Sequence, residues 1–204
     1  MGAEKPGRPR AFDPVAALKK ALDVFLRQGY DAASLDDLTQ AMGINRPSLY
    51  AAFGSKGDLY NAALRHYAAK NTDYILTALR SAESPISGVQ TLFRQSAEKI
   101  ATQGANCLIV SSAAQCGRGT ETCDLAIEGA THNVLEDLTA QLEAFFADAQ
   151  RQRRMKKDIG ARALAHYFIG LIQGLTVLAR TTGDADAVSD MAEAACAFLE
   201  PLRV

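Results

Sequence analysis

The sequence predicts an all-α fold, and two observations support this. Apolar residues recur at the three- and four-residue spacing of a helix in nearly every segment, whereas the alternation typical of a β-strand is scarce. Proline and glycine stand where such segments begin and end, as at Pro14 and Gly43. A chain of 204 residues, of which 48% are hydrophobic, is long enough to bury a core, and this composition excludes wholesale disorder.

The first predicted helix follows Asp13, which can cap it. Pro14 then takes the first helical position, where a backbone N–H is not needed. Gly29 suits the end of this helix. Residues 1–11 are rich in Pro, Gly and Arg and are expected to form a flexible basic arm. The helix face expected to be buried carries Leu18, Leu22 and Phe25.

A short second helix is predicted after Ser34, whose hydroxyl can cap it. Asp37 lies three residues further on, where a negative charge favours the positive end of the helix dipole. Gly43 is expected to end the helix after about two turns. Its apolar face carries Leu35, Leu38, Ala41 and Met42.

A third helix, also short, is predicted to begin after Asn45. Pro47 falls in its first turn, where the proline starts a helix and does not break one. Leu49 and Phe53 share the face that would hold this helix to a core, and Gly54 ends it. The opposite face is polar and carries small side chains, which a purely structural helix does not need.

Long helices are predicted for most of the remaining chain. Ser55 and Asp58 can cap the helix that follows Gly54. The run RQRRMKK at 151–157 is expected to be a solvated helix end or a loop. Further helices are expected over about 85–103, 106–116, from after residue 122 to about 154, 159–182 and 185–202.

The net charge of −1 conceals an uneven distribution. Residues 1–70 carry 10 Lys and Arg against 7 Asp and Glu, and residues 71–204 carry 12 against 16. The basic excess therefore lies near the N-terminus, where it can meet a polyanion. The first residues lack the apolar stretch of a signal peptide, and the most apolar run, 164–179, is short for a membrane span. We expect a cytoplasmic protein without a membrane partner.

Cysteine and histidine spacings do not indicate a metal site. The four cysteines form no C-x-x-C pair, and none lies at zinc-finger spacing from a histidine. A P-loop, a Rossmann glycine pattern and a G-x-S-x-G motif are also missing from the sequence. We expect no cofactor and no enzymatic activity. An all-helical enzyme using a pair such as Cys107 and His132, or a helical scaffold protein, stays open as an alternative.

Two short helices joined by a glycine turn have the form of a helix-turn-helix. The second helix can be short because only its N-terminal half needs to enter the major groove of DNA. Arg46 could reach guanine or a phosphate, and Ala51 would let the helix lie close to a base. Helical bundles that do not bind DNA contain similar turns, so periodicity alone leaves both interpretations open. The candidate DNA-contacting residues are Arg8, Arg10, Ser34, Asn45, Arg46, Pro47, Ser48, Tyr50, Ala51 and Lys56.

Residues 13–70, and above all SLDDLTQAMGINRPSLYAAFGSKGDLYNAAL, resemble the DNA-binding domain of the TetR family of transcriptional regulators. The resemblance implies that Tyr50 and Lys56 contact phosphates of double-stranded DNA, while residues 46–52 read bases. Gly57 departs from the family pattern and is expected to weaken the first turn of its helix by up to roughly 1 kcal/mol. The implied organisation is a flexible basic arm at 1–11, a three-helix DNA-binding domain with the helix-turn-helix at 12–70, and a helical ligand-binding and dimerisation domain at 71–204.

For residues 71–204 the resemblance implies a domain that binds a small molecule and forms a homodimer through its last two helices. The implied function is a dimeric repressor that a ligand releases from a palindromic operator. Glycines four residues apart in GLIQG permit close helix approach. The candidate dimer residues are Gly170, Gly174, Leu178 and Phe198. The candidate ligand-binding residues are Phe93, His132, Phe145, Tyr167, Phe168 and Gln173.

The stretch NCLIVSSAAQC resembles a segment of one branch of the same family, in which some members sense oxidants or electrophiles through a cysteine. Cys107 is expected at a helix N-terminus, where the dipole favours a thiolate. Cys116 could pair with Cys123 under oxidation. A thiol-based redox or electrophile-sensing regulator is therefore the alternative function. The opposing interpretation is that each cysteine is a small buried packing residue.

Overall fold

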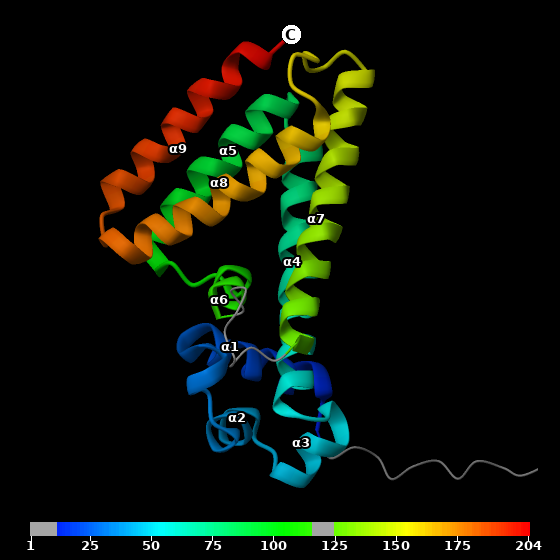
Figure 1. The fold of residues 1–204 in the computed structure, drawn as a ribbon, viewed down its shortest axis with the longest axis vertical. Coiled ribbons are helices and arrows are strands. Elements are labelled where there is room, and N and C mark those ends of the chain that lie inside the picture. The colour runs from blue at the N-terminus through cyan, green and yellow to red at the C-terminus, as the bar shows by residue number, and fades with distance from the viewer. Residues whose placement is uncertain (1–11, 116–124) are drawn as a thin grey trace, which may run out of the picture. The chain divides into compact units, whose positions relative to one another are not determined.

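The computed structural model describes residues 12–115 and 125–204, and within these ranges every regular element is a helix (Figure 1). This confirms the predicted all-α fold. Arg8, Arg10, Cys116 and Cys123 lie outside the described residues. The elements are α1 Pro14–Ala32, α2 Leu35–Met42, α3 Arg46–Phe53, α4 Lys56–Ser81, α5 Pro85–Gln103, α6 Leu108–Gln115, α7 Leu125–Arg151, α8 Ala161–Thr182, α9 Ala185–Leu199 and the 3₁₀ turn η1 Glu200–Leu202.

The chain divides into two compact units. The N-terminal unit is Met1–Ala63 and the C-terminal unit is Leu64–Val204, so that the division falls inside α4. The N-terminal unit contains α1, α2, α3 and the first turns of α4. The boundary expected at residue 70 concerns where one function ends and another begins, and it stays a prediction.

Helix α1 is interrupted at the residue where the sequence predicts its end. Gly29 has a φ of 79° and a ψ of 179°, which are not helical, but one further turn carries the helix to Ala32. The predicted buried face is wrong for Leu18 and Leu22, which are only half-buried. Small side chains lie against the core in their place, because they let the helix approach closely. The residues that α1 buries are Ala17, Ala21, Val24 and Phe25.

The ends of α2 and α3 form as the sequence predicts. The Ser34 hydroxyl accepts the backbone N–H of Asp37 at 3.0 Å, and the Asp37 carboxylate accepts the backbone N–H of Ser34 at 3.1 Å. Gly43 ends α2 with a φ of 71°, a left-handed conformation that side chains with a Cβ rarely adopt. Asn45 Oδ1 then accepts the backbone N–H of Ser48 at 2.9 Å. The turn between the two helices is therefore short and fixed at both ends.

The core of the N-terminal unit contains large side chains from each of its helices. The rings of Phe25 and Tyr60 meet edge to face, with 4.8 Å between their centroids. Leu38 from α2 and Leu49 from α3 are fully buried, and Leu59 lies beside Tyr60 in the first turn of α4. Burying a leucine side chain completely stabilises a fold by about 1.5–3 kcal/mol, so Leu49 alone is a strong anchor for the eight residues of α3.

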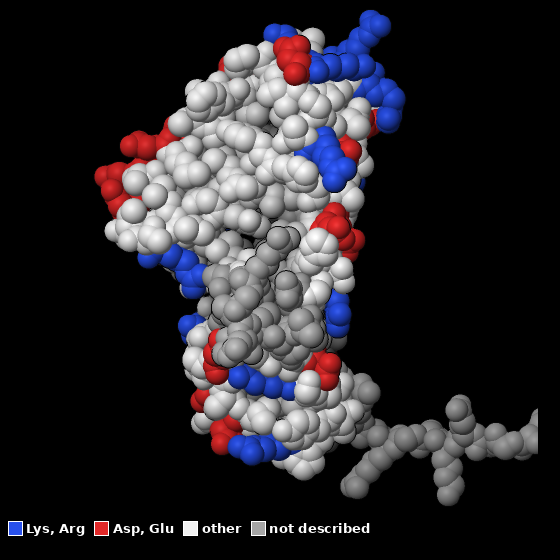
Figure 2. All heavy atoms as spheres, in the orientation of Figure 1, with Lys and Arg blue, Asp and Glu red and all other residues white. Residues whose placement is uncertain are grey.

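In the C-terminal unit, α5, α8 and α9 lie side by side, and α7 packs against α8 (Figure 1). Figure 2 shows that the visible face of this unit over α5, α8 and α9 is largely uncharged. The core between these helices is apolar and aromatic. Its largest buried members include Phe93, Leu142, Phe146, Phe168 and Leu175.

A polar cluster, which we call the C-terminal clasp, joins the end of α9 to the start of α5; it consists of Ser84, Gln90, Glu200 and Arg203. Arg203 donates to Ser84 Oγ at 3.1 Å and to Gln90 Oε1 at 3.3 Å, and its Nε donates to Glu200 Oε1 at 2.6 Å. Gln90 Nε2 donates to Glu200 Oε2 at 2.9 Å. Hydrogen bonds from Arg203 and then from Gln90 lower the pKa of Glu200 to about 2.

The segment between α7 and α8 corrects two expectations. Helix α7 ends at Arg151, three residues before the predicted end, and Arg153 has a left-handed φ of 58° that is incompatible with a continuing helix. The run at 151–157 is not wholly solvated, because the side chain of Met155 is 2% exposed and belongs to the core.

Helix α8 is, among the described residues, long and apolar enough to cross a membrane by length and composition. The expectation that this region is too short for a span is therefore wrong as a matter of length. A helix in the core of a water-soluble protein has the same composition, and α8 contributes Phe168 and Leu175 to the core.

Candidate functional site

Helix α3 is held from one side and open on the other. Leu49 is fully buried, whereas Tyr50 is 50% exposed. Ala51 is exposed, and Ser48 and Ala52 are half-buried. The chain therefore packs one stripe of α3 and leaves the stripe with small and polar side chains available to a partner.

Arg46, at the start of α3, is paired with Asp36 on α2. Its Nη2 lies 2.8 Å and its Nε 3.2 Å from the same carboxylate oxygen, Asp36 Oδ1. Both side chains remain largely exposed, at 54% for Arg46 and 78% for Asp36. An exposed pair of this kind contributes at most about 1 kcal/mol and exchanges readily. The pair orients the guanidinium while leaving it able to move to another anion.

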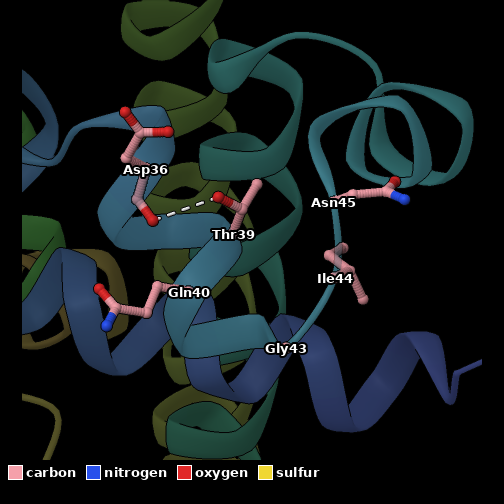
Figure 3. Close-up of a pocket in the computed structure, with 6 residues that line it drawn as sticks. All are labelled: Asp36, Thr39, Gln40, Gly43, Ile44 and Asn45. Carbon is pink, nitrogen blue, oxygen red and sulfur yellow. Dashed lines mark hydrogen bonds between the residues drawn. The ribbon is translucent and has the colours of Figure 1, made fainter.

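An open hollow of about 590 Å³ lies across α2 and the turn (Figure 3). Thr39 lines this hollow, and its hydroxyl donates to the backbone oxygen of Asp36 at 3.2 Å. A hollow so exposed cannot keep a small molecule out of water. We therefore treat it as part of the surface that faces a macromolecule. The lining residues are Asp36, Thr39, Gln40, Gly43, Ile44 and Asn45.

Lys56 is held in place at the start of α4. Its ammonium lies 4.5 Å from the centroid of the Tyr30 ring, and it donates to the backbone oxygen of Asp31 at 3.4 Å. The Tyr30 ring in turn meets the ring of Tyr60 at 5.1 Å. Burial lowers the pKa of Lys56, although Asp31 opposes this shift. The charge is thus positioned beside the N-terminus of a helix, a favourable place for a phosphate.

The described candidate DNA-contacting residues fall on the surface of α2, α3 and the start of α4. Ser34 and Asn45 are also helix caps, so part of their hydrogen-bonding capacity is used within the chain. Whether these residues contact DNA stays a prediction. The sequence analysis missed Asp36 as the partner of Arg46. The pair joins residues ten positions apart on different helices, and no local pattern signals it.

The C-terminal unit encloses a cavity of about 550 Å³, within the size range of small-molecule sites. Helices α4, α5, α7 and α8 form its walls, and residues around the start of α6 close one side. Its lining residues are Tyr67, Ala68, Lys70, Asn71, Thr72, Tyr74, Ile75, Leu92, Gln95, Ser96, Lys99, Ile100, Gly104, Asn106, Cys107, Ile109, Val134, Leu135, Leu138, Phe168, Ile169, Ile172, Gln173 and Thr176.

Cys107 lines this cavity directly before α6. Its thiol lies against the hydroxyl of Tyr67, which also meets the backbone N–H of Leu108. Burial, with Cys107 as a second cause, raises the pKa of Tyr67 well above its ordinary value. Helix α6 is tied to α8 as well, because Arg180 Nη1 donates to Ser111 Oγ at 3.1 Å. The short helix α6 at one end of the cavity is therefore held by contacts with both α4 and α8.

Two of the six candidate ligand residues, Phe168 and Gln173, line the cavity. Phe93 is fully buried in the core, where its ring stacks on Phe168 at 5.3 Å. His132 is exposed and lies 3.2 Å from Glu136, one turn along α7. Phe145 and Tyr167 also lie outside the lining. Four of the six candidate ligand residues therefore lie outside the described lining of the cavity.

The sequence analysis missed the polar wall of the cavity. On α4, residues 67, 70, 71 and 74 share one face at helical spacing. This stripe is visible in the sequence, but an exposed polar stripe ordinarily faces solvent. Only the position of α5 shows that it faces a cavity.

The candidate dimer residues differ in their surroundings. Gly170 has open space where a Cβ would be, whereas a Cβ at Gly174 would lie 3.0 Å from Met191 Cε of the same chain. Leu178 is half-buried, and Phe198 is 76% exposed. The close approach at Gly174 is thus made within the chain, between α8 and α9, while Gly170 and Phe198 remain uncovered. Their role in a dimer stays a prediction.

Within the described ranges, no group of three or more His, Cys, Asp or Glu side chains could hold a metal ion. The two described cysteines, Cys107 and Cys196, are not in a disulfide.

The comparisons with known proteins agree with this geometry. The family model for bacterial regulatory proteins of the tetR family matches residues 17–63, which include α2, the turn and α3. The HTH-type transcriptional repressor ComR of Escherichia coli K12 is 29% identical over 178 residues, covering 85% of this chain and 82% of ComR. The uncharacterized HTH-type transcriptional regulator YezE of Bacillus subtilis 168 is 27% identical over 206 residues, covering 95% and 100% respectively.

A solved structure extends the similarity to both units. It holds a cysteine mutant of the TetR family transcriptional regulator CifR, complexed with a 26-bp double-strand operator DNA. Its sequence is 32% identical to this chain, the TM-score is 0.78, and the match covers 93% of this chain and 98% of the CifR chain. With the helix-turn-helix matched by the family model and the whole length matched at this identity, the chain belongs to the TetR family of DNA-binding transcriptional regulators.

Proposed function

We propose that this protein is a repressor of transcription that binds a pseudo-palindromic operator as a homodimer and leaves it when a small molecule binds. The observation that carries the proposal is the uncovered stripe of α3, with Tyr50 half exposed above a fully buried Leu49. A helix anchored by one side and capped at its N-terminus presents that end to the major groove. CifR, which is similar over its whole length, has been solved with operator DNA.

A dimer gives one short helix enough specificity. Each copy reads few base pairs, and a two-fold axis doubles the site and fixes the spacing between half-sites. The visible surface over α8 and α9 supports this arrangement, because it is largely uncharged (Figure 2). Two large apolar side chains of these helices, Val177 on α8 and Phe198 on α9, are also exposed in the single chain. Burial of such side chains between two copies would stabilise the pair.

The cavity of the C-terminal unit supports release by a ligand. A small molecule shifts the protein toward a non-binding arrangement only if it binds that arrangement more tightly. Helix α6 begins at the cavity and is hydrogen-bonded to α8, which belongs to the proposed dimer face. A ligand in the cavity can therefore change the distance between the α3 helices of the two copies. We place the protein in the cytoplasm and expect no catalytic activity.

The test is a mobility-shift titration with inverted repeats from the DNA that flanks the gene. Arg46→Ala should weaken binding at least tenfold, and binding should fall steeply with salt because phosphate contacts release counterions. Arg80→Ala is the matched control, since Arg80 is an exposed arginine of the C-terminal unit. Equal effects of the two substitutions, or no retention of any duplex at low salt, would refute the proposal.

A second candidate is that Cys107 senses an oxidant or an electrophile. The favouring observation is its position, since it lines the cavity, precedes α6 and contacts the Tyr67 hydroxyl. The test uses protein in which Cys116 and Cys123 are replaced by serine, so that Cys107 and Cys196 are compared. Burial raises the pKa of the Cys196 thiol, so N-ethylmaleimide should label Cys107 much faster. Equally slow labelling of both cysteines would remove this candidate.

A further inference from the structure

The walls of the cavity differ in chemistry. Its α7 side is formed by Val134, Leu135 and Leu138, and its α8 side begins with Phe168, Ile169 and Ile172. The side formed by α4 is polar by comparison, with Tyr67, Lys70, Asn71, Thr72 and Tyr74. A molecule that fills this space must therefore be apolar along one side or end and polar at the other.

The charge on the lining has one sign. Among the residues that the structure describes, the ionised side chains of the lining are Lys70 and Lys99, and none of the described lining residues is Asp or Glu. Both lysines are exposed, and neither forms an ion pair or hydrogen bond with another described residue. Asp73 and Glu98 lie on the same helices but outside the lining. Within the described ranges, these two positive charges of the cavity lining are therefore not neutralised by an ion pair.

The two lysines lie on the same side of the hydrogen bond between Tyr74 and Gln95. The chain reverses direction between α4 and α5 (Figure 1), and the Tyr74 hydroxyl donates to Gln95 Oε1 at 2.8 Å across the two helices. Lys70 is one helical turn before Tyr74, and Lys99 is one turn after Gln95. Because the helices run in opposite directions, both steps lead away from the turn at 82–84, so that the two lysines lie at a similar level along α4 and α5.

We propose that this cavity selects an anionic amphiphile: a molecule with an apolar body that lies against α7 and α8, and a single acidic head group that pairs with Lys70 and Lys99. The apolar wall discriminates poorly between bodies of similar size. The two lysine charges determine whether an anionic or a cationic ligand binds, since an anion is attracted to both lysines and a cation is repelled by both. The regulatory meaning of this binding rests on the proposed function, but the binding itself does not.

The probes are octanoate, 1-octanol and octyltrimethylammonium, which share one apolar chain and differ in charge. Isothermal titration of the full-length protein should show octanoate binding at least tenfold more tightly than octyltrimethylammonium. In Lys70→Gln/Lys99→Gln, octanoate should bind about tenfold more weakly, as expected for two exposed ion pairs. The affinity for 1-octanol should change less than twofold. Lys157→Gln is the matched control, because Lys157 is an exposed lysine outside the lining, and it should bind all three probes as the wild type does.

The proposal is overturned if octanoate binds no more tightly than octyltrimethylammonium, or if the double variant keeps the wild-type affinity for octanoate. Operator binding without probe is measured separately, and the double variant should retain it. Lysine-dependent octanoate binding without operator retention would refute the repressor and leave this inference standing. Operator retention without a preference for octanoate would refute this inference and leave the repressor function standing.

Discussion

Arg46 at the start of α3 shares one carboxylate oxygen of Asp36 between its Nε and Nη2, at 3.2 and 2.8 Å. The pair holds a cation at the N-terminus of α3 and at the same time places a negative charge beside the surface that would meet DNA. Asp36→Asn should therefore free the guanidinium and remove a repulsion. We expect operator affinity at low salt to rise about two- to fivefold.

Mobility shift at two salt concentrations measures this effect, with Asp23→Asn as a control because Asp23 is an exposed aspartate of α1. A fall in affinity would mean that Asp36 orients Arg46 productively and does not restrain it. A larger gain on unrelated duplex than on the operator would show that the pair also contributes to sequence discrimination.

Tyr50→Phe should weaken DNA binding about tenfold or more without loss of stability, because a hydrogen bond to a charged group contributes about 1.5 kcal/mol or more. The ring is half exposed, and its hydroxyl makes no hydrogen bond to another described residue. The loss should be similar for operator and unrelated duplex, as expected for a phosphate contact. Titration of both duplexes checks this, with Tyr167→Phe in the C-terminal unit as the control. A loss confined to the operator would indicate a base contact.

The C-terminal clasp predicts a loss of stability in acid. The pKa of Glu200 is lowered to about 2 in the folded protein, from an ordinary value of 4.5. A lowered carboxyl pKa stabilises the fold above the unfolded value, and this contribution is lost as the pH falls from about 5 toward 2. The thermal midpoint should fall over this window, and less steeply in Glu200→Gln. Glu98→Gln, at an exposed glutamate, should keep the wild-type slope; an identical slope in Glu200→Gln would contradict the role of the clasp.

Phe198→Glu should dissociate the proposed homodimer without unfolding the chain, because the ring is 76% exposed in the single chain. Loss of one buried phenylalanine at an interface, with a charge in its place, should weaken association by about 100-fold or more. Sedimentation equilibrium measures the change. Val15→Glu, at an exposed valine of the N-terminal unit, should leave association unchanged. An undisturbed dimer in Phe198→Glu would place the interface elsewhere.

Local chemistry predicted the helix-turn-helix well. The Ser34–Asp37 capping box, the left-handed Gly43 and the Asn45 cap each depend on residues within four positions of one another. Such signals are strong in a single sequence because the hydrogen bonds they form do not depend on distant packing. The all-α class follows in the same way from helical periodicity.

Features that join distant segments were not predictable. The partner of Arg46 lies ten residues away, and the polar wall of the cavity depends on how α4 and α5 diverge. Phe93 and Phe168 looked alike as candidates, and both are buried in the core, but the packing leaves only Phe168 in the cavity lining as well. Met155 looked solvated because its neighbours in the sequence are charged, and it fills the core only because the segment after α7 turns back.

Tyr30 meets the buried ring of Tyr60 edge to face and the ammonium of Lys56 with its own face, and so links an internal ring to a charge that is expected at the DNA surface. A genetic selection for derepressed colonies would therefore return changes at Tyr30 together with changes at exposed positions. From their position in the chain, the substitutions at Tyr30 would be interpreted as folding defects. The purified proteins would nevertheless remain folded and would have lost the positioning of the Lys56 ammonium.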